Sequence, residues 1–299
     1  MKNILIVGGT GLVGTHLSRL LRGHGYTVSH LSRHADPQAE FPTFAWQPDK
    51  GTYDKKAFDN VDAIINLAGA GIVDKRWTTD RKRVIIESRT LSNALITKFL
   101  QKEKHNIKAY ISASAIGFYA DRGKSLMTEK DEAGKGFLAE STVAWENAID
   151  EVQKTGLRTV ALRIGIVLST EGGALPEMLK PFVVRTGVYF GNGEQYLSWI
   201  HIEDLCRMFQ FVLEQDNMSG IFNAVAPNPM TNYAFTQAIA ETKGGGYLLV
   251  PAPAFTLRLA MGEMADTVLG STKVSSQKIE NQGFTFIYPG ALSALKSLL

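Results

Sequence analysis

Residues 3–14, which read NILIVGGTGLVG, decide the fold of this chain. The apolar run at residues 4–7 is typical of a strand that is buried on both faces, as the strands of parallel sheets are. Apolar side chains then recur at helical spacing from residue 12 as far as Gly23. The stretch therefore predicts a strand, a tight turn made of glycines, and a helix that begins inside the glycine cluster.

The glycines of this turn fit two overlapping patterns, G-x-G-x-x-G from Gly9 and G-x-x-G-x-x-G from Gly8. Such glycines allow a tight turn, let a pyrophosphate approach the backbone, and let the helix pack on the strand. The N–H groups and the positive end of the helix then hold phosphates. We expect this turn to bind a dinucleotide; the alternative is a glycine turn with a purely structural role. The residues expected to contact the cofactor here are Gly8, Thr10, Gly11, Leu12, Val13 and Gly14.

The composition is that of an ordinary globular protein: 299 residues, of which 44% are hydrophobic and 20% charged. The length suggests one large domain or two interlocked domains. A net charge of +3 is too small to indicate nucleic acid or an anionic membrane as partner. The single cysteine, Cys206, excludes an internal disulfide and is expected in the core. The sequence contains neither a signal peptide nor an apolar run of ~18 residues, which favours a cytoplasmic protein.

The second predicted strand, at residues 27–31, is followed directly by Ser32 and Arg33. In a dinucleotide-binding fold the end of this strand meets the adenosine ribose, and an acid there accepts a hydrogen bond from the 2′-hydroxyl of NAD. A cation and a small hydroxyl suit a 2′-phosphate instead. The sequence therefore predicts NADP(H) as the cofactor; the alternative is that Arg33 is a surface arginine.

The third predicted strand and its loop, residues 62–71, read DAIINLAGAG. The small residues would let a cofactor lie across the strand end, and Leu67, Ala68 and Gly69 are expected to contact it. A cluster of basic residues follows. It either forms the solvated face of a helix or attracts a phosphorylated ligand to the mouth of the cleft. Its members are Lys75, Arg76, Arg81, Lys82 and Arg83. A helix is predicted over residues 88–100.

Strands and helices continue to alternate up to residue 168, which predicts a right-handed, doubly wound parallel sheet. The elements expected are strands at 109–114 and 159–164 and a helix at 137–152. From Ser169 glycine and proline become frequent, and residues 191–193 indicate a hairpin or an exposed loop. Asp204, near a predicted helix start, is expected to have a structural role.

We therefore expect a parallel sheet domain at residues 1–168, with returning segments at about 198–242. A smaller C-terminal α/β substrate lobe is expected at residues 169–299. The elements predicted in the second half of the chain are a helix to residue 213, a strand at 221–225, a helix at 232–242, mainly helical chain from 251, an extended piece at 283–289 and a terminal helix.

Several motifs together resemble the extended short-chain dehydrogenase/reductase superfamily: VGGTGLVG, NLAG, SASA, LRIGIVL and WIHIEDL. More closely, the chain resembles an atypical NADP-binding "epimerase family" subgroup that is similar to nucleotide-sugar epimerases. The motifs SASAIGFY, FLAESTVAWE, GGALPEMLKPF and GEQYLSWIHI carry this second resemblance. The tail from Val250 resembles the C-terminal domain of unknown function of that subgroup, at about residues 250–299. The resemblance implies a Rossmann-type fold with its active site between sheet and lobe.

The superfamily resemblance implies chemistry by a serine, a tyrosine and a lysine, in which the tyrosine exchanges a proton. Ser114 matches the serine by its place at the end of a strand. If Glu146 is the acid of the usual Y-x-x-x-K-x-x-x-E spacing, Leu138 stands at the tyrosine position and Thr142 at the lysine position. A leucine cannot transfer a proton, so the chain departs from the pattern here.

Two residues are candidates for the missing acid/base: Tyr119, five positions after Ser114, and Glu140, at the start of the helix that normally carries the tyrosine. The structural alternatives are a packing tyrosine and a first-turn acid that complements the helix dipole. For Ser114 the alternative is a cap at the strand end. The predicted catalytic residues are thus Ser114, Tyr119 and Glu140, and no metal site is predicted.

Two functions fit these features. The first is an NADP(H)-binding oxidoreductase or epimerase-like protein that acts on a small polar or nucleotide-linked substrate with a non-standard acid/base. The second is an NADP(H)-binding sensor or regulatory protein with little or no turnover. A homodimer is compatible with either function.

Overall fold

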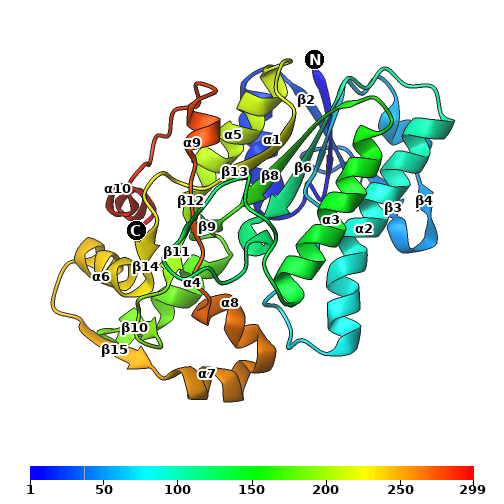
Figure 1. The fold of residues 1–299 in the computed structure, drawn as a ribbon. Helices are drawn as coiled ribbons and strands as arrows, with labels where there is room; N and C mark the ends of the chain where they lie inside the picture. Colours follow the sequence, from blue (N-terminus) through cyan, green and yellow to red (C-terminus); the bar gives the residue numbers. More distant parts are fainter. Residues whose placement is uncertain (37) are drawn as a thin grey trace.

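The computed structural model, which describes residues 1–36 and 38–299, is built on a large sheet with helices on both faces (Figure 1). Within these residues the sheet has eight strands, and all neighbouring pairs are parallel except the last. In spatial order the strands are β13 (Gly220–Ala224), β8 (Arg158–Ile164), β6 (Ala109–Ala115), β5 (Ala63–Asn66), β1 (Asn3–Val7), β2 (Thr27–Ser32), β3 (Thr43–Gln47) and β4 (Thr52–Tyr53). This confirms the predicted doubly wound parallel sheet.

The helices form a layer on each face of the sheet (Figure 1). On one face α1 (Leu12–Gly23) packs against α5 (Ile202–Glu214), and on the other α2 (Thr79–Lys102) packs against α3 (Phe137–Gln153). The strands between them are buried on both sides: Ile4, Leu5, Ile6 and Val7 are at most 1% exposed. Continuous apolar strand sequences are thus the consequence of two helical layers.

The strand order reverses direction beside β1. From β1 the chain moves one way to β2 and β3, and it later continues on the other side through β5, β6 and β8. Val7 at the end of β1 pairs in register with Leu31 of β2 and with Asn66 of β5. The carboxyl ends of three strands therefore meet at the glycine turn, and such a switch point is where open α/β sheets bind ligands.

A smaller lobe is built from two-stranded sheets and helices beyond the carboxyl ends of the main strands (Figure 1). Its paired strands are β9 (Ile166–Leu168) with β12 (Trp199–His201), β10 (Thr186–Phe190) with β15 (Leu248–Ala252), β11 (Tyr196–Leu197) with β14 (Met230–Thr231), and β7 (Leu126–Met127) with β16 (Lys273–Val274). Its helices are α4 (Ala174–Leu179), α6 (Asn232–Lys243), α7 (Ala254–Met261), α8 (Asp266–Leu269) and α10 (Ala291–Leu298), whereas α9 (Gln277–Glu280) packs on β13 of the main sheet. Short 3-10 helices are η1 (Pro48–Lys50), η2 (Lys55–Phe58), η3 (Ile116–Phe118), η4 (Lys180–Val184) and η5 (Gly262–Ala265).

The two parts have separate buried apolar clusters. The larger surrounds the main sheet and includes residues of α5 and β13, which return to the sheet after the first stretch of the small lobe. The smaller joins Leu168, Trp199, Phe235 and Leu295, which come from four elements of the lobe. Cys206 on α5 is buried in the larger cluster, as predicted, and burial raises the pKa of its thiol to about 12.

Two segments differ from the predictions. Helix α2 begins at Thr79 rather than residue 88, because the Thr78 side chain accepts a hydrogen bond from the Arg81 N–H at 3.1 Å and caps the helix. Strand β15 was not predicted, and its last two residues fall in the stretch expected to be mainly helical from residue 251. Of the two alternatives for residues 191–193, the structure has a loop and not a hairpin, since β10 pairs with β15 and β11 pairs with β14.

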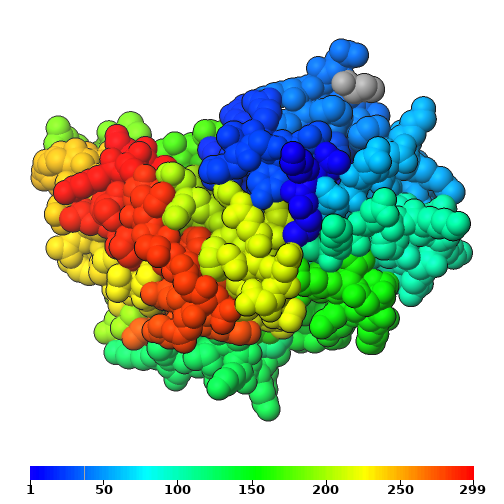
Figure 2. Space-filling model, turned by 90° about the horizontal axis from the view of Figure 1, so that it is seen from above, coloured from blue at the N-terminus to red at the C-terminus, as the bar shows by residue number. Residues whose placement is uncertain are grey.

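The predicted extended piece at 283–289 lies outside any strand, and Asp204 is one of the side chains that hold it. The buried Asp204 carboxylate accepts hydrogen bonds from the N–H groups of Ile287 at 2.9 Å and Tyr288 at 2.8 Å. Figure 2 shows the C-terminal residues, in orange and red, lying directly against the yellow-green segment that contains α5. Asp204 therefore has the structural role expected of it.

Candidate functional site

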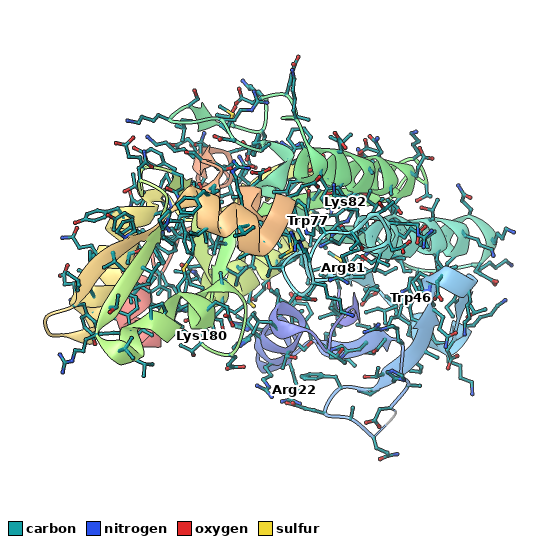
Figure 3. All side chains as sticks on the ribbon, turned by 90° about the horizontal axis from the view of Figure 1, so that it is seen from below. Arg22, Trp46, Trp77, Arg81, Lys82 and Lys180 are labelled. Atoms are coloured by element: carbon teal, nitrogen blue, oxygen red, sulfur yellow. The ribbon has the colours of Figure 1, made fainter. Side chains whose placement is uncertain are left out.

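A cleft of about 700 Å³ opens at the carboxyl ends of β1, β2 and β5. Figure 3 looks at this end of the molecule, with Arg81 near the centre and Trp46 to one side. The predicted cofactor residues that line the cleft are Gly8, Thr10, Gly11, Ser32, Arg33, Leu67, Ala68 and Gly69. The other three, Leu12, Val13 and Gly14, are absent from its lining and form the first turn of α1.

The glycine turn is tightly folded against the strand ends. Gly8 has a φ of 76°, and its N–H donates to the Leu31 carbonyl at 3.1 Å. A Cβ at Gly14 would lie 2.6 Å from three backbone atoms of Gly8 and Gly9, so Gly14 lets helix α1 approach the turn. A Cβ at Gly11 would meet only the Gly8 carbonyl oxygen, at an ordinary 3.4 Å. The protein itself therefore leaves space above Gly11, on a surface that lines the cleft.

His30 of β2 supports this turn from below. A Cβ at Gly9 would collide with the His30 ring, and the Ser18 hydroxyl lies 2.7 Å from His30 Nε2. The same hydroxyl donates to the Gly14 carbonyl at 2.6 Å, so His30 Nε2 carries a hydrogen and donates to Ser18. Burial lowers the pKa of His30 to about 4. The ring is therefore a neutral part of the scaffold under the glycine turn.

One end of the cleft lies between β2 and the chain after β3. Ser32 and the exposed Arg33 form one wall, and Trp46, Pro48 and Asp49 form the other. Residues 41–53 have only a weak strand pattern, so the sequence did not predict the second wall. Asp49 places an exposed carboxylate in the same end of the cleft as Arg33.

The opposite wall is the loop after β5, braced by helix α2. The Asn66 side chain accepts from the Ala68 N–H at 3.0 Å, and the Ser88 hydroxyl accepts from the Ala70 N–H at 2.9 Å. Arg81 donates to the Gly71 carbonyl and forms an ion pair with Asp74 at 3.4 Å. Of the basic cluster, only Arg81 is among the cleft-lining residues.

Helix α2 supplies one further set of lining residues that the sequence analysis missed. Arg81, Val84, Ser88 and Leu91 recur at helical spacing on the face toward the cleft. This periodicity was a usable signal. It was missed because the helix was predicted to start at residue 88, after the first two residues of this set.

Ser114, the penultimate residue of β6, is buried and bonded to another side chain. Its hydroxyl donates to Glu146 Oε1 at 2.6 Å. Arg163 of β8 holds the same carboxylate, with Nε 2.8 Å from Oε1 and Nη2 2.7 Å from Oε2. Ser114 is therefore engaged with a buried ion pair between β8 and α3, and it is absent from the lining of the cleft.

Tyr119, just after η3, is fully buried and continues this network. Its hydroxyl accepts from Arg163 Nη1 at 2.9 Å and donates to Asn223 Oδ1 at 2.8 Å. Burial raises the pKa of the Tyr119 hydroxyl, and the Arg163 charge opposes that rise. These contacts favour the packing alternative, because a hydroxyl that transfers protons must reach the substrate.

Glu140 is exposed on the first turn of α3, where a negative charge complements the helix dipole. Leu138 and Thr142 face Gly117 in η3, so the positions of the usual tyrosine and lysine do adjoin the strand end that carries Ser114. The Thr142 hydroxyl donates to the Leu138 carbonyl at 2.8 Å. The assignment of Ser114, Tyr119 and Glu140 as catalytic stays a prediction.

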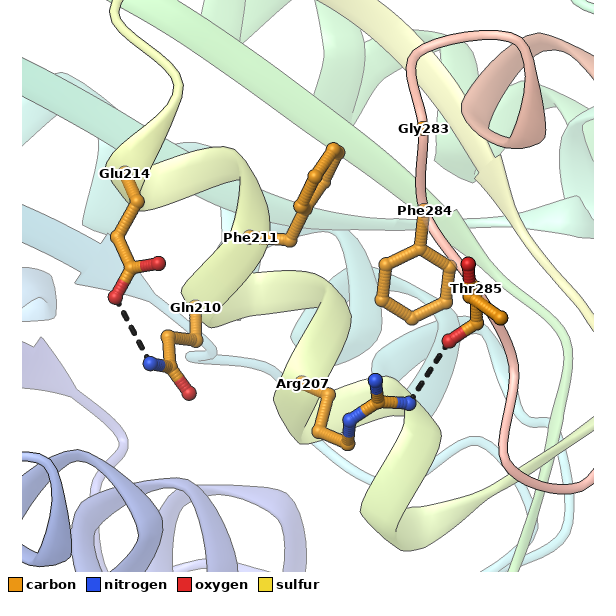
Figure 4. Close-up of a pocket in the computed structure, with 7 residues that line it drawn as sticks. All are labelled: Arg207, Gln210, Phe211, Glu214, Gly283, Phe284 and Thr285. Carbon is orange, nitrogen blue, oxygen red and sulfur yellow. Dashed lines mark hydrogen bonds between the residues drawn. The ribbon is translucent and has the colours of Figure 1, made fainter.

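A second, shallower hollow of about 270 Å³ lies between α5 and residues 283–285 (Figure 4). Its polar side chains are bonded to neighbours: Arg207 donates to the Thr285 carbonyl at 2.9 Å, and Gln210 donates to Glu214 at 2.8 Å. Glu214 also accepts a hydrogen bond from the Tyr26 hydroxyl at 2.8 Å. Burial, and to a smaller extent this bond, raise the pKa of Tyr26 to about 12. The Arg207 bond holds the C-terminal segment on α5.

In residues 1–36 and 38–299 there is no group of three or more His, Cys, Asp or Glu side chains arranged to hold a metal ion. No helix of this described part is long and apolar enough to span a membrane.

A buried strand, a glycine turn and a helix, with a cleft at the switch point of a parallel sheet, define a Rossmann-type dinucleotide-binding protein. The chain belongs to the NAD dependent epimerase/dehydratase family, whose family model matches residues 4–224. Residues 252–298 match a domain of unknown function, DUF1731. The predicted resemblance to this family, with its C-terminal domain, is confirmed.

Curated relatives match along nearly the whole chain. It is 36% identical over 285 residues to the Mycobacterium bovis "Epimerase family protein Mb2239", covering 95% of this chain and 93% of the relative. It is 34% identical to the Bacillus subtilis "Epimerase family protein YfhF", with 99% and 98% covered.

Solved structures agree with the fold. The human epimerase family protein SDR39U1 (isoform 2) with NADPH superposes with a TM-score of 0.88 at 29% identity, covering 99% of this chain and 98% of the other. A nucleoside-diphosphate sugar epimerase from Corynebacterium glutamicum superposes with a TM-score of 0.80 at 31% identity. That match covers 100% of this chain and 58% of the other chain.

Proposed function

We propose that the cleft at the glycine turn binds NADP(H). The observation that carries this proposal is the space above Gly11, which the protein leaves open while the neighbouring Gly14 is closely packed. Backbone N–H groups at a helix start are suited to phosphate oxygens. The human structural relative described with NADPH supports the same ligand.

The cofactor would lie across the strand ends. The turn from Gly8 to Gly11, with Leu12 and Val13 at the helix start, would hold the pyrophosphate, and Leu67, Ala68 and Gly69 would contact the cofactor where it crosses the end of β5. Ser32 and Arg33 would hold the 2′-phosphate, since a guanidinium and a hydroxyl both donate to phosphate oxygens. When bound, the cofactor would supply hydride chemistry, and the chain would supply orientation and electrostatics.

The reaction that we propose is oxidation–reduction or epimerisation of a small polar or nucleotide-linked substrate. Membership of the epimerase/dehydratase family supports this class. The smaller lobe stands beyond the carboxyl ends of the strands, where a substrate would meet the cofactor (Figure 1). We further propose that residues 1–168, with segments returning at about 198–242, form the cofactor domain, and that residues 169–299 form the substrate lobe.

A second candidate function is an NADP(H)-binding sensor or regulatory protein with little or no turnover. The buried network favours it, because the hydroxyls of Ser114 and Tyr119 are both bonded within the protein. Under the enzyme hypothesis, Ser114 would orient the substrate oxygen and Tyr119 or Glu140 would exchange the proton that Leu138 cannot.

The test is hydride exchange between stereospecifically deuterated NADPH and a panel of carbonyl compounds and nucleotide sugars. Transfer of deuterium to any substrate, lost on substitution Ser114→Ala, would establish the enzyme hypothesis. Tight NADPH binding without transfer to the panel would favour the sensor. Transfer that survives Ser114→Ala, Tyr119→Phe and Glu140→Gln would refute the catalytic assignment.

A further inference from the structure

Arg89 is a buried cation in the middle of helix α2. Its residue is 9% exposed, and its guanidinium packs 4.8 Å from the ring of Trp145 on α3. Nη1 donates to the Ile85 carbonyl at 2.9 Å, and Nη2 donates to the Ala70 carbonyl at 3.1 Å. The guanidinium thus bonds to neutral oxygens of the helix and of the loop that lines the cleft.

Arg89 has no counter-ion in the described part of the chain. No carboxylate of the described residues lies within 4 Å of the Arg89 guanidinium. Burial lowers the pKa of Arg89 to about 10, and the nearby Arg81 charge adds to that shift. Arg163, by contrast, has the Glu146 carboxylate at 2.7 Å. A buried charge without a partner costs free energy, so its presence calls for an anion that the folded chain does not itself supply.

The position of Arg89 indicates where that anion would lie. A Cβ at Gly69 would be 2.9 Å from Arg89 Cζ, so the guanidinium fills the space where a side chain at position 69 would stand. Gly69 lines the cleft. The same loop abuts the phosphate turn, since a Cβ at Gly8 would lie 3.1 Å from the Leu67 carbonyl carbon. Arg89 is therefore beneath the wall that adjoins the glycine turn.

We propose that Arg89 is the positive charge that compensates the pyrophosphate of the dinucleotide, acting from beneath the loop at residues 69–71. This inference rests on the proposed function, since it assigns a phosphate-recognition role at the same cleft. Arg89 would then be an electrostatic and positioning residue for both NADPH and NADH, which share the pyrophosphate. Arg33 would act on NADPH alone, because only NADPH carries the 2′-phosphate.

The experiment is calorimetric titration of NADPH and NADH into wild type, Arg89→Met, Arg89→Gln and the matched control Arg33→Met. The two neutral Arg89 variants should bind both cofactors roughly tenfold or more weakly, by equal factors, as expected for the loss of a positive charge close to the shared pyrophosphate. The control should lose affinity for NADPH and keep its affinity for NADH. Arg89→Lys should retain more affinity than Arg89→Gln, although both can donate to the Ala70 carbonyl.

The outcomes separate the two proposals. Unchanged binding of both cofactors to Arg89→Met or Arg89→Gln would overturn the role of Arg89 and leave the proposed function standing. Loss confined to NADPH would assign Arg89 to the 2′-phosphate and also overturn the proposal. Equal cofactor affinity of the Lys and Gln variants would also overturn the proposal, because it would mean that Arg89 acts only by donating a hydrogen bond to the Ala70 carbonyl. Wild type that binds neither cofactor would overturn both proposals.

The salt dependence of binding gives a second readout if the neutral variants do not fold. Arg89→Lys keeps the charge, so its NADH affinity should fall with rising salt as steeply as in wild type. In a folded neutral variant the dependence should be weaker, since one positive charge near the phosphates is lost. A Lys variant that folds with wild-type stability but has lost NADH binding and its salt dependence would contradict a role based on charge.

Discussion

Arg163 of β8 and Glu146 of α3 form a bidentate ion pair inside the protein, with Nε 2.8 Å from Oε1 and Nη2 2.7 Å from Oε2. Their side chains are 3% and 9% exposed. Ser114 donates to the same carboxylate and Tyr119 accepts from the same guanidinium. Four elements of the fold, β6, β8, α3 and the segment after η3, are therefore joined through one buried polar network.

Removing either member of this ion pair should strongly destabilise the folded protein. Arg163→Met or Glu146→Gln should lower the free energy of unfolding by ~3–5 kcal/mol, because each leaves a buried charge without its partner. The double variant Arg163→Met/Glu146→Gln should lose less than the sum of the two single losses. Urea unfolding of the four proteins measures this. Additive losses would contradict a direct coupling of the two residues.

Tyr119→Phe separates the structural role of Tyr119 from a catalytic one. Removing the hydroxyl leaves Arg163 Nη1 and Asn223 Oδ1 without a partner, so the free energy of unfolding should fall by ~1–3 kcal/mol. Cofactor affinity should be unchanged. If Tyr119 instead exchanges the proton, hydride transfer should fall by ~10²–10⁴-fold. A rate loss of that size without any loss of stability would refute the structural assignment.

Two glycines of the phosphate turn should respond differently to an added methyl group. Gly14→Ala should lower the melting temperature, because its Cβ would stand 2.6 Å from backbone atoms of Gly8 and Gly9. Gly11→Ala should leave the melting temperature of the unliganded protein nearly unchanged and weaken NADPH binding. Thermal unfolding with and without NADPH checks both. Normal NADPH affinity in a folded Gly11→Ala protein would mean that the phosphates lie elsewhere.

Stability should fall with acid because of His30. Its pKa is about 4 in the folded protein, against ~6.5 in an unfolded chain, so the unfolded state takes up the proton first. The His30 contribution to stability is therefore present above ~pH 6.5 and is lost as the pH falls toward 4. His30→Gln should flatten this part of the stability profile, and His24→Gln, on the surface, should leave it unchanged. Identical profiles for wild type and His30→Gln would contradict the assignment.

Much of the main sheet could be predicted because its signals are local. The apolar strand at residues 4–7 and the glycines after it predicted β1, the turn and α1, and repeated strand–helix patterns predicted the rest of the doubly wound sheet. The start of α2 was wrong because Thr78 caps the helix within a polar stretch that has little apolar periodicity. Strand β15 could not be predicted either, since its partner β10 lies about 60 residues earlier in the chain.

The site was predicted only where backbone and position decide it. Gly8 and Arg33 are at places that a strand–turn–helix pattern fixes, and both line the cleft. The partners of Ser114 and Tyr119 depend on distant pairing: Arg163 is 44 residues from Tyr119, and Asn223 is 104 residues away. The burial of Arg89 without an acid likewise follows from the packing of α2 on α3 and left no pattern in the sequence.

The central claim, that the cleft is built for NADP(H), is tested most directly by titrating the wild-type protein and Arg33→Ala with NADPH and with NADH. The account predicts that wild type binds NADPH roughly tenfold to a hundredfold more tightly than NADH, since a charge-assisted bond to phosphate contributes ~1.5–3 kcal/mol. Arg33→Ala should remove most of that difference by weakening NADPH alone. Equal affinities in wild type, or tighter binding of NADH that is lost on Asp49→Ala, would contradict the claim.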